Sequence, residues 1–140
     1  MNELELYKLF KVVLNFRKAI DKCDNSELSV SFKNFPKGNC TDAVLILAHY
    51  LKEKGYGDFD YISGERWNVT HAWLVKDNVL IDISCDKFED QENKVIVTAN
   101  SKWHNEFITD VREKTSLDML EPENKDTLLN CYKKIVEGIG

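Results

Sequence analysis

The chain has 140 residues, of which 43% are hydrophobic and 31% are charged, and its formal net charge is −5. This length and composition predict one globular domain over residues 1–140, with a core large enough to fold without disulfides. The acidic balance argues against a nucleic-acid partner, because proteins that bind nucleic acids normally present a basic surface. The longest apolar run, Ala43–Ala48, is too short to span a membrane, so no membrane association is expected.

The first half of the sequence predicts two helices. Apolar residues recur at nearly 3.6-residue spacing between Glu3 and Lys22, which indicates an amphipathic helix. Residues 24–38 are polar and contain a proline and a glycine, so an irregular loop is expected there. A second helix is expected from about Cys40 to Lys54, and its uninterrupted apolar residues 43–47 predict a central, buried position.

The second half predicts a sheet followed by a final helix. Segments rich in Val, Ile, Trp and Tyr predict four strands, at Phe59–Ile62, Asn68–Val75, Val79–Ser84 and Lys94–Thr98. Gly64 is expected in a turn, and the segment Ser101–Asp118 has no pattern that assigns it. Thr127–Val136 predicts the last helix, with Asp126 as its N-cap. The predicted fold class is α+β, with an antiparallel sheet of about four strands, a central helix and flanking terminal helices.

The four cysteines, Cys23, Cys40, Cys85 and Cys131, are far apart in the sequence, and none belongs to a C-x-x-C pair. The N-terminal residues are acidic and then amphipathic, which is not the pattern of a secretory signal. Reduced thiols in the cytoplasm are therefore expected, unless a dedicated secretion system exports the protein.

Three of these segments carry residues that suit nucleophilic catalysis. Cys40 opens the apolar helix, His71 lies in a Thr-His-Ala-Trp strand, and Asp82 lies in the following Ile-Asp-Ile strand. A thiolate at a helix N-terminus is stabilised by unpaired backbone N–H groups and by the helix dipole. A histidine can then act as base and acid, and a carboxylate can orient it. The N–H groups of that helix end also offer an oxyanion hole.

The proposed His71–Asp82 contact depends on the turn between their strands. A two-residue turn at Asp77-Asn78 sets His71 opposite Ser84 and Trp73 opposite Asp82, which makes His71 and Asp82 diagonal neighbours on one face. A three-residue turn would place them on opposite faces. The triad therefore requires an even-length turn.

The segments Gly38-Asn39-Cys40, Thr70–Leu74 and Ile81–Ser84 resemble the transglutaminase-like branch of the papain-like superfamily. The resemblance covers about residues 35 to 88, and the segment Ser84–Phe88 is similar to the Thr-x-Asp-x-Phe tail of small bacterial members. It implies a central helix that carries Cys40 and packs on an antiparallel sheet, with Cys40 as nucleophile, His71 as general base and acid, and Asp82 as the orienting carboxylate.

The same resemblance implies a cysteine hydrolase or acyl transferase that acts on a peptide or protein amide through a thioester acyl-enzyme. Small size and the His-Ala-Trp strand are also similar to the leader peptidases of lasso peptides, whereas no calcium-binding carboxylate pattern of animal transglutaminases is present. Asn39 is a candidate oxyanion-hole side chain, with Asn34 as the alternative. Trp73 and Trp67 are candidates for the wall of a substrate groove or for core positions.

Other interpretations stay open at this point. A protein deamidase or transglutaminase effector would use the same three residues, and a binding module would keep Cys40 only for packing. Cys23, Cys85 and Cys131 are expected to be structural. No cofactor is predicted, and no metal, because His49, His71 and His104 lack a ligand spacing. A substrate contact by His104 is a further possibility.

Overall fold

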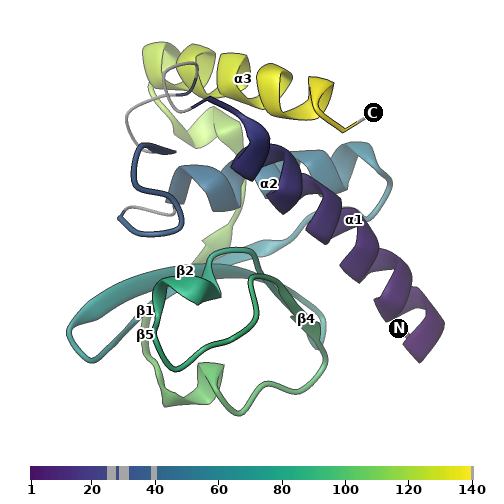
Figure 1. Ribbon diagram of the computed structural model, residues 1–140, viewed down its shortest axis with the longest axis vertical. Coiled ribbons are helices and arrows are strands. Elements are labelled where there is room, and N and C mark those ends of the chain that lie inside the picture. The colour runs from purple at the N-terminus through teal and green to yellow at the C-terminus, as the bar shows by residue number, and fades with distance from the viewer. Residues whose placement is uncertain (25–27, 29–31, 39–40, 140) are drawn as a thin grey trace.

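The structure is a computed structural model that describes residues 1–24, 28, 32–38 and 41–139. Within these ranges the chain has three α-helices and one five-stranded antiparallel sheet (Figure 1). The α+β fold class is thus confirmed, while the expected sheet of about four strands is corrected to five.

The three helices are α1 (Glu3–Lys22), α2 (Thr41–Glu53) and α3 (Pro122–Glu137). The bounds of α1 are those predicted, and a capping box between Asn2 and Glu5 closes its N-terminus. The third helix begins earlier than expected, since its N-cap is Glu121 and not Asp126. A proline in the first turn of α3 explains this start, because proline lacks the N–H group that would have no partner there.

The sheet has the strand order β4-β3-β2-β1-β5. The strands are β1 (Asp60–Arg66), β2 (Val69–Lys76), β3 (Val79–Asp82), β4 (Ile96–Thr98) and β5 (Ile108–Lys114). Short 3-10 helices lie between and after the last strands, at η3 (Cys85–Lys87), η4 (His104–Glu106) and η5 (Leu117–Met119).

The fifth strand, β5, lies in the segment that sequence patterns left unassigned. All seven of its residues are exposed, so it lacks the alternation of buried and exposed positions by which strands are recognised. It pairs with β1 across a register shift between Ser63 and Gly64. Gly64 is therefore a strand residue and not a turn residue. A Cβ atom there would lie 2.8 Å from the carbonyl oxygen of Ile108, so the glycine permits the close approach of β5.

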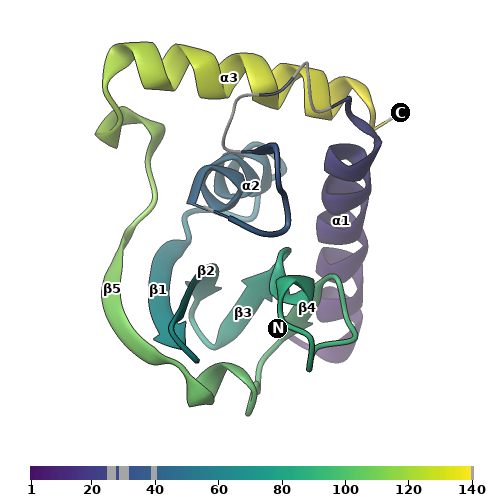
Figure 2. The same cartoon turned by 60° about the vertical axis from the view of Figure 1, so that its left-hand side comes forward.

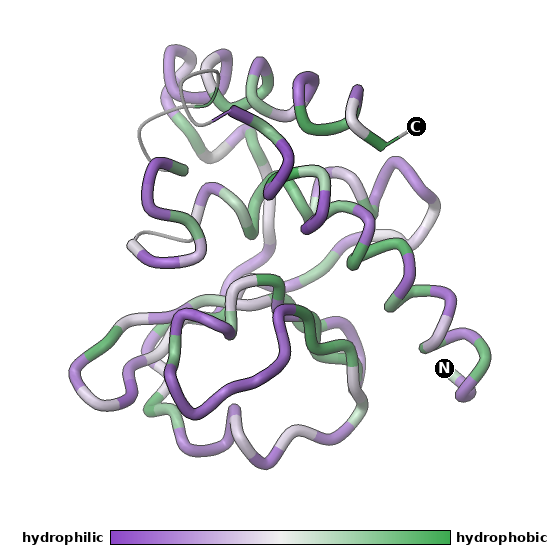
Figure 3. The backbone as a smooth tube through the Cα atoms, viewed as in Figure 1, coloured by the Kyte–Doolittle hydropathy of each residue, from purple (hydrophilic) through white to green (hydrophobic). Residues whose placement is uncertain are grey.

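The two faces of the sheet have different coverings. The helices pack on one face, where residues such as Ala72, Leu74 and Ile81 join the main core with α1, α2 and α3. Parts of the segment between β3 and β5, before and after β4, cover the other face, as the two views in Figures 1 and 2 show. Apolar positions alternate with hydrophilic ones along α1 and α3 (Figure 3), as expected for helices with one buried side.

A smaller core fills the space under that segment. Its buried residues are Ile62, Trp73, Phe88 and Phe107, with Trp103 packed against them. Strand alternation assigns His71 and Trp73 to this face, because their neighbours Ala72 and Leu74 belong to the helical side. The candidate site, which includes His71, lies in this smaller core.

Candidate functional site

The His71 side chain is enclosed by aromatic rings. Its ring centroid lies 5.4 Å from that of Phe88, 5.7 Å from that of Phe107 and 6.2 Å from that of Trp103. Only 1% of the residue is exposed. A polar group buried to this extent must be hydrogen-bonded to avoid a large desolvation cost. The partner that meets this need is Asp82.

Asp82 ends β3 and accepts a hydrogen bond from His71, with 2.6 Å between Nε2 and Oδ2. Its other oxygen accepts from the backbone N–H of Ser84 at 2.9 Å. The strand register that makes this possible pairs Leu74 with Ile81 and Lys76 with Val79. This is the register of a two-residue turn, so the prediction that His71 and Asp82 lie within reach on one face is confirmed.

A second histidine reaches the same carboxylate oxygen. His104, in η4, is 97% buried, and its Nε2 lies 2.7 Å from Oδ2 of Asp82. Its Nδ1 lies 2.5 Å from the hydroxyl of Ser101, which also accepts the backbone N–H of His104 at 3.2 Å. Sequence reasoning named His104 only as a possible substrate contact, and it did not include Ser101.

The ionisation of Asp82 reflects two opposing effects. Burial on its own favours the neutral acid, but the charge of His71 and the hydrogen bonds from His104 and His71 more than offset it. The pKa of Asp82 therefore lies well below its ordinary value. The carboxylate stays charged inside the protein because several N–H groups point at it.

The same three residues are close enough to share a metal ion. The candidate ligand atoms of His71, Asp82 and His104 all lie within 4.8 Å of one another. In the described geometry, however, the facing Nε2 atoms of both histidines are hydrogen-bonded to the carboxylate. An ion would have to replace both hydrogen bonds, because metal binding uses deprotonated imidazole nitrogens. We therefore assign the cluster as a hydrogen-bonded network.

Cys40 and Asn39, the predicted nucleophile and oxyanion-hole residue, lie outside the described residues. The described residues on either side of them, Gly38 and Thr41, line one pocket of about 270 Å³ together with His71. The hydroxyl of Thr41 lies 3.0 Å from that of Tyr61, which fixes the start of α2 against β1. The chain on both sides of position 40 thus borders the same pocket as the candidate base.

The body of α2 packs on the face of the sheet opposite to the His71 ring. The last residue pair between β2 and β3 is Leu74–Ile81, so β2 from Val69 to Trp73 pairs only with β1 among the described strands. The pocket next to His71 lies at that end of β2.

The two tryptophans that were candidates for a substrate groove have different surroundings. Trp73 is 3% exposed, and its ring centroid lies 4.9 Å from that of His104, so it belongs to the smaller core. Trp67 is 64% exposed in the β1–β2 turn, where the Arg66 guanidinium lies 3.6 Å from its ring centroid. Asn34, the alternative oxyanion-hole residue, is exposed. The structure brings Trp73, but not Trp67, next to the His71–Asp82 pair.

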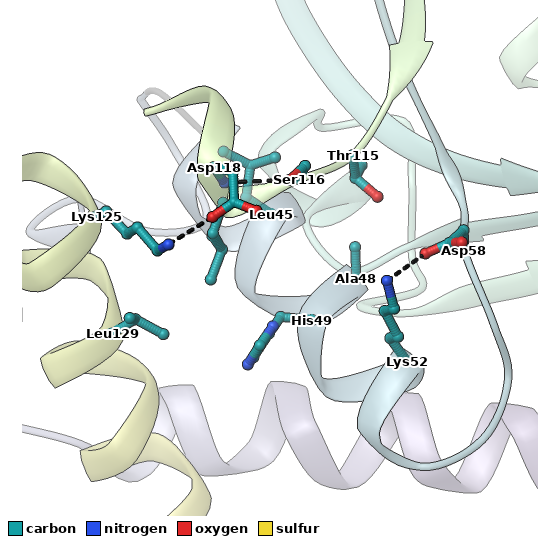
Figure 4. Close-up of a pocket in the computed structure, with 11 residues that line it drawn as sticks. Leu45, Ala48, His49, Lys52, Asp58, Thr115, Ser116, Asp118, Lys125 and Leu129 are labelled. Atoms are coloured by element: carbon teal, nitrogen blue, oxygen red, sulfur yellow. Dashed lines mark hydrogen bonds and ion pairs between the residues drawn. The ribbon is translucent and has the colours of Figure 1, made fainter. Parts of the chain in front are cut away.

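A pocket of about 300 Å³ lies away from this site, between α2, α3 and the segment after β5 (Figure 4). Its charged residues pair with one another, as Lys52 does with Asp58 at 3.0 Å and Lys125 with Asp118 at 2.5 Å. His49 at its edge contacts Glu53 at 2.8 Å. No nucleophile–base pair lines this pocket among the residues that the structure describes.

The cysteines outside the predicted triad have structural surroundings. Cys85 and Cys131 are buried, and Cys23 is half-buried at the end of α1. The Cys85 thiol donates to the carbonyl oxygen of Asn93 at 3.0 Å. Burial and the nearby charges of Asp82 and Asp86 raise the pKa of Cys85 far above its ordinary value. Cys85 is therefore a poor candidate for a nucleophile.

No α-helix in the described ranges combines the length and apolar character needed to cross a bilayer. Comparison of the chain with protein-family models, with curated proteins and with solved structures gives no match. Any functional conclusion therefore rests on the residues and geometry of the chain.

Proposed function

We propose that the protein is a cysteine-dependent hydrolase or acyl transferase of the papain-like, transglutaminase-like kind, with Cys40 as nucleophile, His71 as base and acid, and Asp82 as the orienting carboxylate. The observation that carries the proposal is the buried 2.6 Å hydrogen bond between His71 and Asp82, beside a pocket that Gly38 and Thr41 also line. A buried histidine oriented by a carboxylate is the second half of a nucleophilic triad.

The roles of the two imidazole nitrogens follow from this bond. Since Nε2 of His71 is held by Asp82, Nδ1 is the nitrogen that would take the proton from the Cys40 thiol. The thiolate would attack the carbonyl carbon of an amide, and the imidazolium would return the proton to the departing amine. Water or an acceptor amine would then release the acyl group from the thioester, with His71 removing a proton from the incoming nucleophile.

A peptide or protein amide is the proposed substrate class. The net charge of −5 favours basic segments through long-range attraction. Water as the acceptor gives peptide hydrolysis, or deamidation where the attacked amide is a glutamine side chain, and an amine acceptor gives transglutamination. The exclusion of water from the acyl-enzyme controls this choice. A thiol nucleophile also agrees with the reduced, cytoplasmic location expected from the separated cysteines.

A non-catalytic binding module is the second candidate. It is favoured by the burial of His71, Asp82 and His104, which are each at most 3% exposed and could serve the fold alone. In this case Cys40 would be alkylated no faster than Cys23, and substitution of His71 would change stability but not the chemistry of Cys40.

The test is alkylation of each cysteine by iodoacetamide between pH 5 and 9, mapped by peptide mass spectrometry in the wild type and in His71→Gln. The proposal expects Cys40 to react rapidly well below pH 8, because a nearby imidazolium lowers thiol pKa values to roughly 3.5–7.5. In His71→Gln the Cys40 profile should move up toward that of an ordinary thiol.

Cys23 is the internal control, since it is half-buried and lies on the far end of α1. Circular dichroism of each variant would establish that it is folded. A Cys40 profile that matches Cys23 in the wild type, or one that His71→Gln does not move, would contradict the triad and favour the binding module.

A further inference from the structure

Asp82 is shared by two imidazoles, whereas a nucleophilic triad needs only one. The Nε2 atoms of both histidines are within hydrogen-bond distance of the same oxygen of Asp82, Oδ2. The Nε2–Oδ2 distance is 2.6 Å for His71 and 2.7 Å for His104. The other oxygen receives the N–H of Ser84. The carboxylate thus has three N–H donors, and two of them, the imidazole of His104 and the backbone N–H of Ser84, belong to residues with no part in the proposed reaction.

The hydrogen-bond pattern around His104 indicates its tautomer. The charged Asp82 carboxylate can only accept, so the Nε2 of His104, which lies 2.7 Å from its Oδ2, carries the hydrogen of that bond. In the neutral ring Nδ1 then carries no hydrogen and accepts from the Ser101 hydroxyl, whose oxygen accepts the backbone N–H of His104. Ser101 and Asp82 therefore hold His104 from both sides as a donor to the carboxylate.

We propose that His104 is a positioning residue. Its Nε2–H donates a hydrogen bond to Oδ2 of Asp82, and this bond weakens the attraction of Asp82 for the proton on His71. Without this donor, the carboxylate would hold more charge density for His71, and the His71–Asp82 pair would bind its proton more tightly. The effect of the His104 hydrogen bond on catalysis rests on the proposed function, but its effect on proton binding by the His71–Asp82 pair does not.

Within the described part of the chain, few other groups lie near enough to Asp82 to disturb this relation. Of the described residues, those that face Asp82 are His71 from β2, His104 from η4, and the thiol of Cys85 with the backbone N–H of Ser84 from the start of η3. The next charges, Arg17 and Asp86, pair with each other at 2.7 Å. Aromatic rings surround both imidazoles, which keeps the hydrogen bonds in a region of low dielectric constant.

The chain contains three histidines, so their imidazole signals can be assigned by single substitutions. The test is a pH titration of the imidazole ¹H–¹⁵N spectra in the wild type, in His104→Gln and in His104→Met. Gln and Met have nearly the same shape and reach, but only Gln offers an N–H donor to Asp82. The two variants therefore separate the hydrogen bond from the packing of the ring.

In His104→Met the titration midpoint of His71 should rise by about one pH unit, since the loss of a hydrogen bond to a charged group is worth about that much. In His104→Gln the midpoint should stay close to that of the wild type. An unchanged midpoint in both variants, or an equal rise in both, would overturn the proposal.

The wild-type spectrum provides a second criterion that holds even if His104→Met does not fold. It should show His104 with its hydrogen on Nε2 and without one on Nδ1, and an Nδ1–H tautomer would overturn the proposal. Loss of both Nε2–H signals on addition of zinc would do the same, because it would make the cluster a metal site. Parallel alkylation of Cys40 reports on the proposed function separately, since an inert Cys40 leaves these spectra interpretable.

Discussion

Arg17 on α1 and Asp86 in η3 form a two-pronged ion pair, with 2.7 Å between Nη1 and Oδ1 and 2.9 Å between Nη2 and Oδ2. The Arg17 side chain is 3% exposed and also donates to the carbonyl oxygens of Ile83 and Lys94. One guanidinium thus joins the first helix to both ends of the segment that follows Asp82.

Substitution of this arginine by an apolar residue of similar length should destabilise the fold strongly. Arg17→Met leaves Asp86 and two carbonyl oxygens without their donor, and a loss of about 3 kcal/mol in unfolding free energy is expected for one broken partner of a buried pair. Urea denaturation followed by circular dichroism measures it. Arg17→Lys, which keeps the charge but not the forked geometry, should lose about half as much. Equal losses in the two variants would show that the charge alone contributes nothing here and that the forked geometry accounts for the whole effect.

The buried carboxylate of Asp82 should make stability depend on pH. Its pKa is depressed in the folded protein, so it contributes stability above the pKa of about 4 that it has in the unfolded chain. That contribution is lost as the pH falls from about 4 toward the folded value. Asp82→Asn should therefore cost about 3 kcal/mol at pH 7, and the difference from the wild type should narrow on acidification.

Urea denaturation at pH 7, 4 and 2.5 checks this dependence. Asp118→Asn is the matched control, because Asp118 also pairs with a cation, Lys125, but is exposed to solvent. The control should follow the wild type at each pH. A difference between Asp82→Asn and the wild type that stays constant down to pH 2.5 would contradict the assignment of a charged Asp82.

A substitution at Ser84 should not destabilise the fold, in contrast to those at Arg17 and Asp82. Its hydroxyl is fully buried and has no hydrogen-bond partner within the described part of the chain. Because an unpaired buried hydroxyl has lost its hydration without compensation, Ser84→Ala should leave stability unchanged or raise it by up to about 1 kcal/mol. Thermal denaturation measures the change, with Ser101→Ala as a comparison that removes a bonded hydroxyl. A clear loss of stability in Ser84→Ala would reveal a partner for this oxygen.

The Cys85 thiol should be inert in the folded protein. Its pKa is raised by burial and by the carboxylates of Asp82 and Asp86, and each unit of increase lowers the thiolate fraction tenfold. Alkylation of Cys85 at pH 8 should be more than about tenfold slower than that of Cys23. In concentrated urea the two rates should become similar, and a persistent difference there would point to a cause other than the fold.

The parts of the fold that could be predicted from the sequence are those governed by local patterns. The apolar spacing of α1 and the two-residue turn at Asp77-Asn78 are determined within a few residues, and both predictions are confirmed. The turn fixes the register of β2 and β3, so the contact between His71 and Asp82 follows from it.

The position of His104 could not be predicted in this way. It lies in a short 3-10 helix within a segment that has neither helical nor strand periodicity. Its contact with Asp82 depends on how the chain between β4 and β5 packs under the sheet, which is a tertiary property. The only local signal is the pair Trp103-His104, since a large aromatic residue indicates burial. The sequence does not predict β5, because all of its residues are exposed and they show no alternation between a buried and an exposed face.

The position of β5 at the edge of the sheet has a consequence for synthesis on the ribosome. Strands β1 and β2 are joined by a tight turn and can pair as soon as they emerge, but the outer edge of β1 has no partner until β5 follows. During this interval the nascent chain presents an open strand edge, which can pair with other chains. Charged residues on β1, such as Asp60 and Glu65, oppose such pairing. A chain cut before Ile108 would keep this edge open permanently and should aggregate.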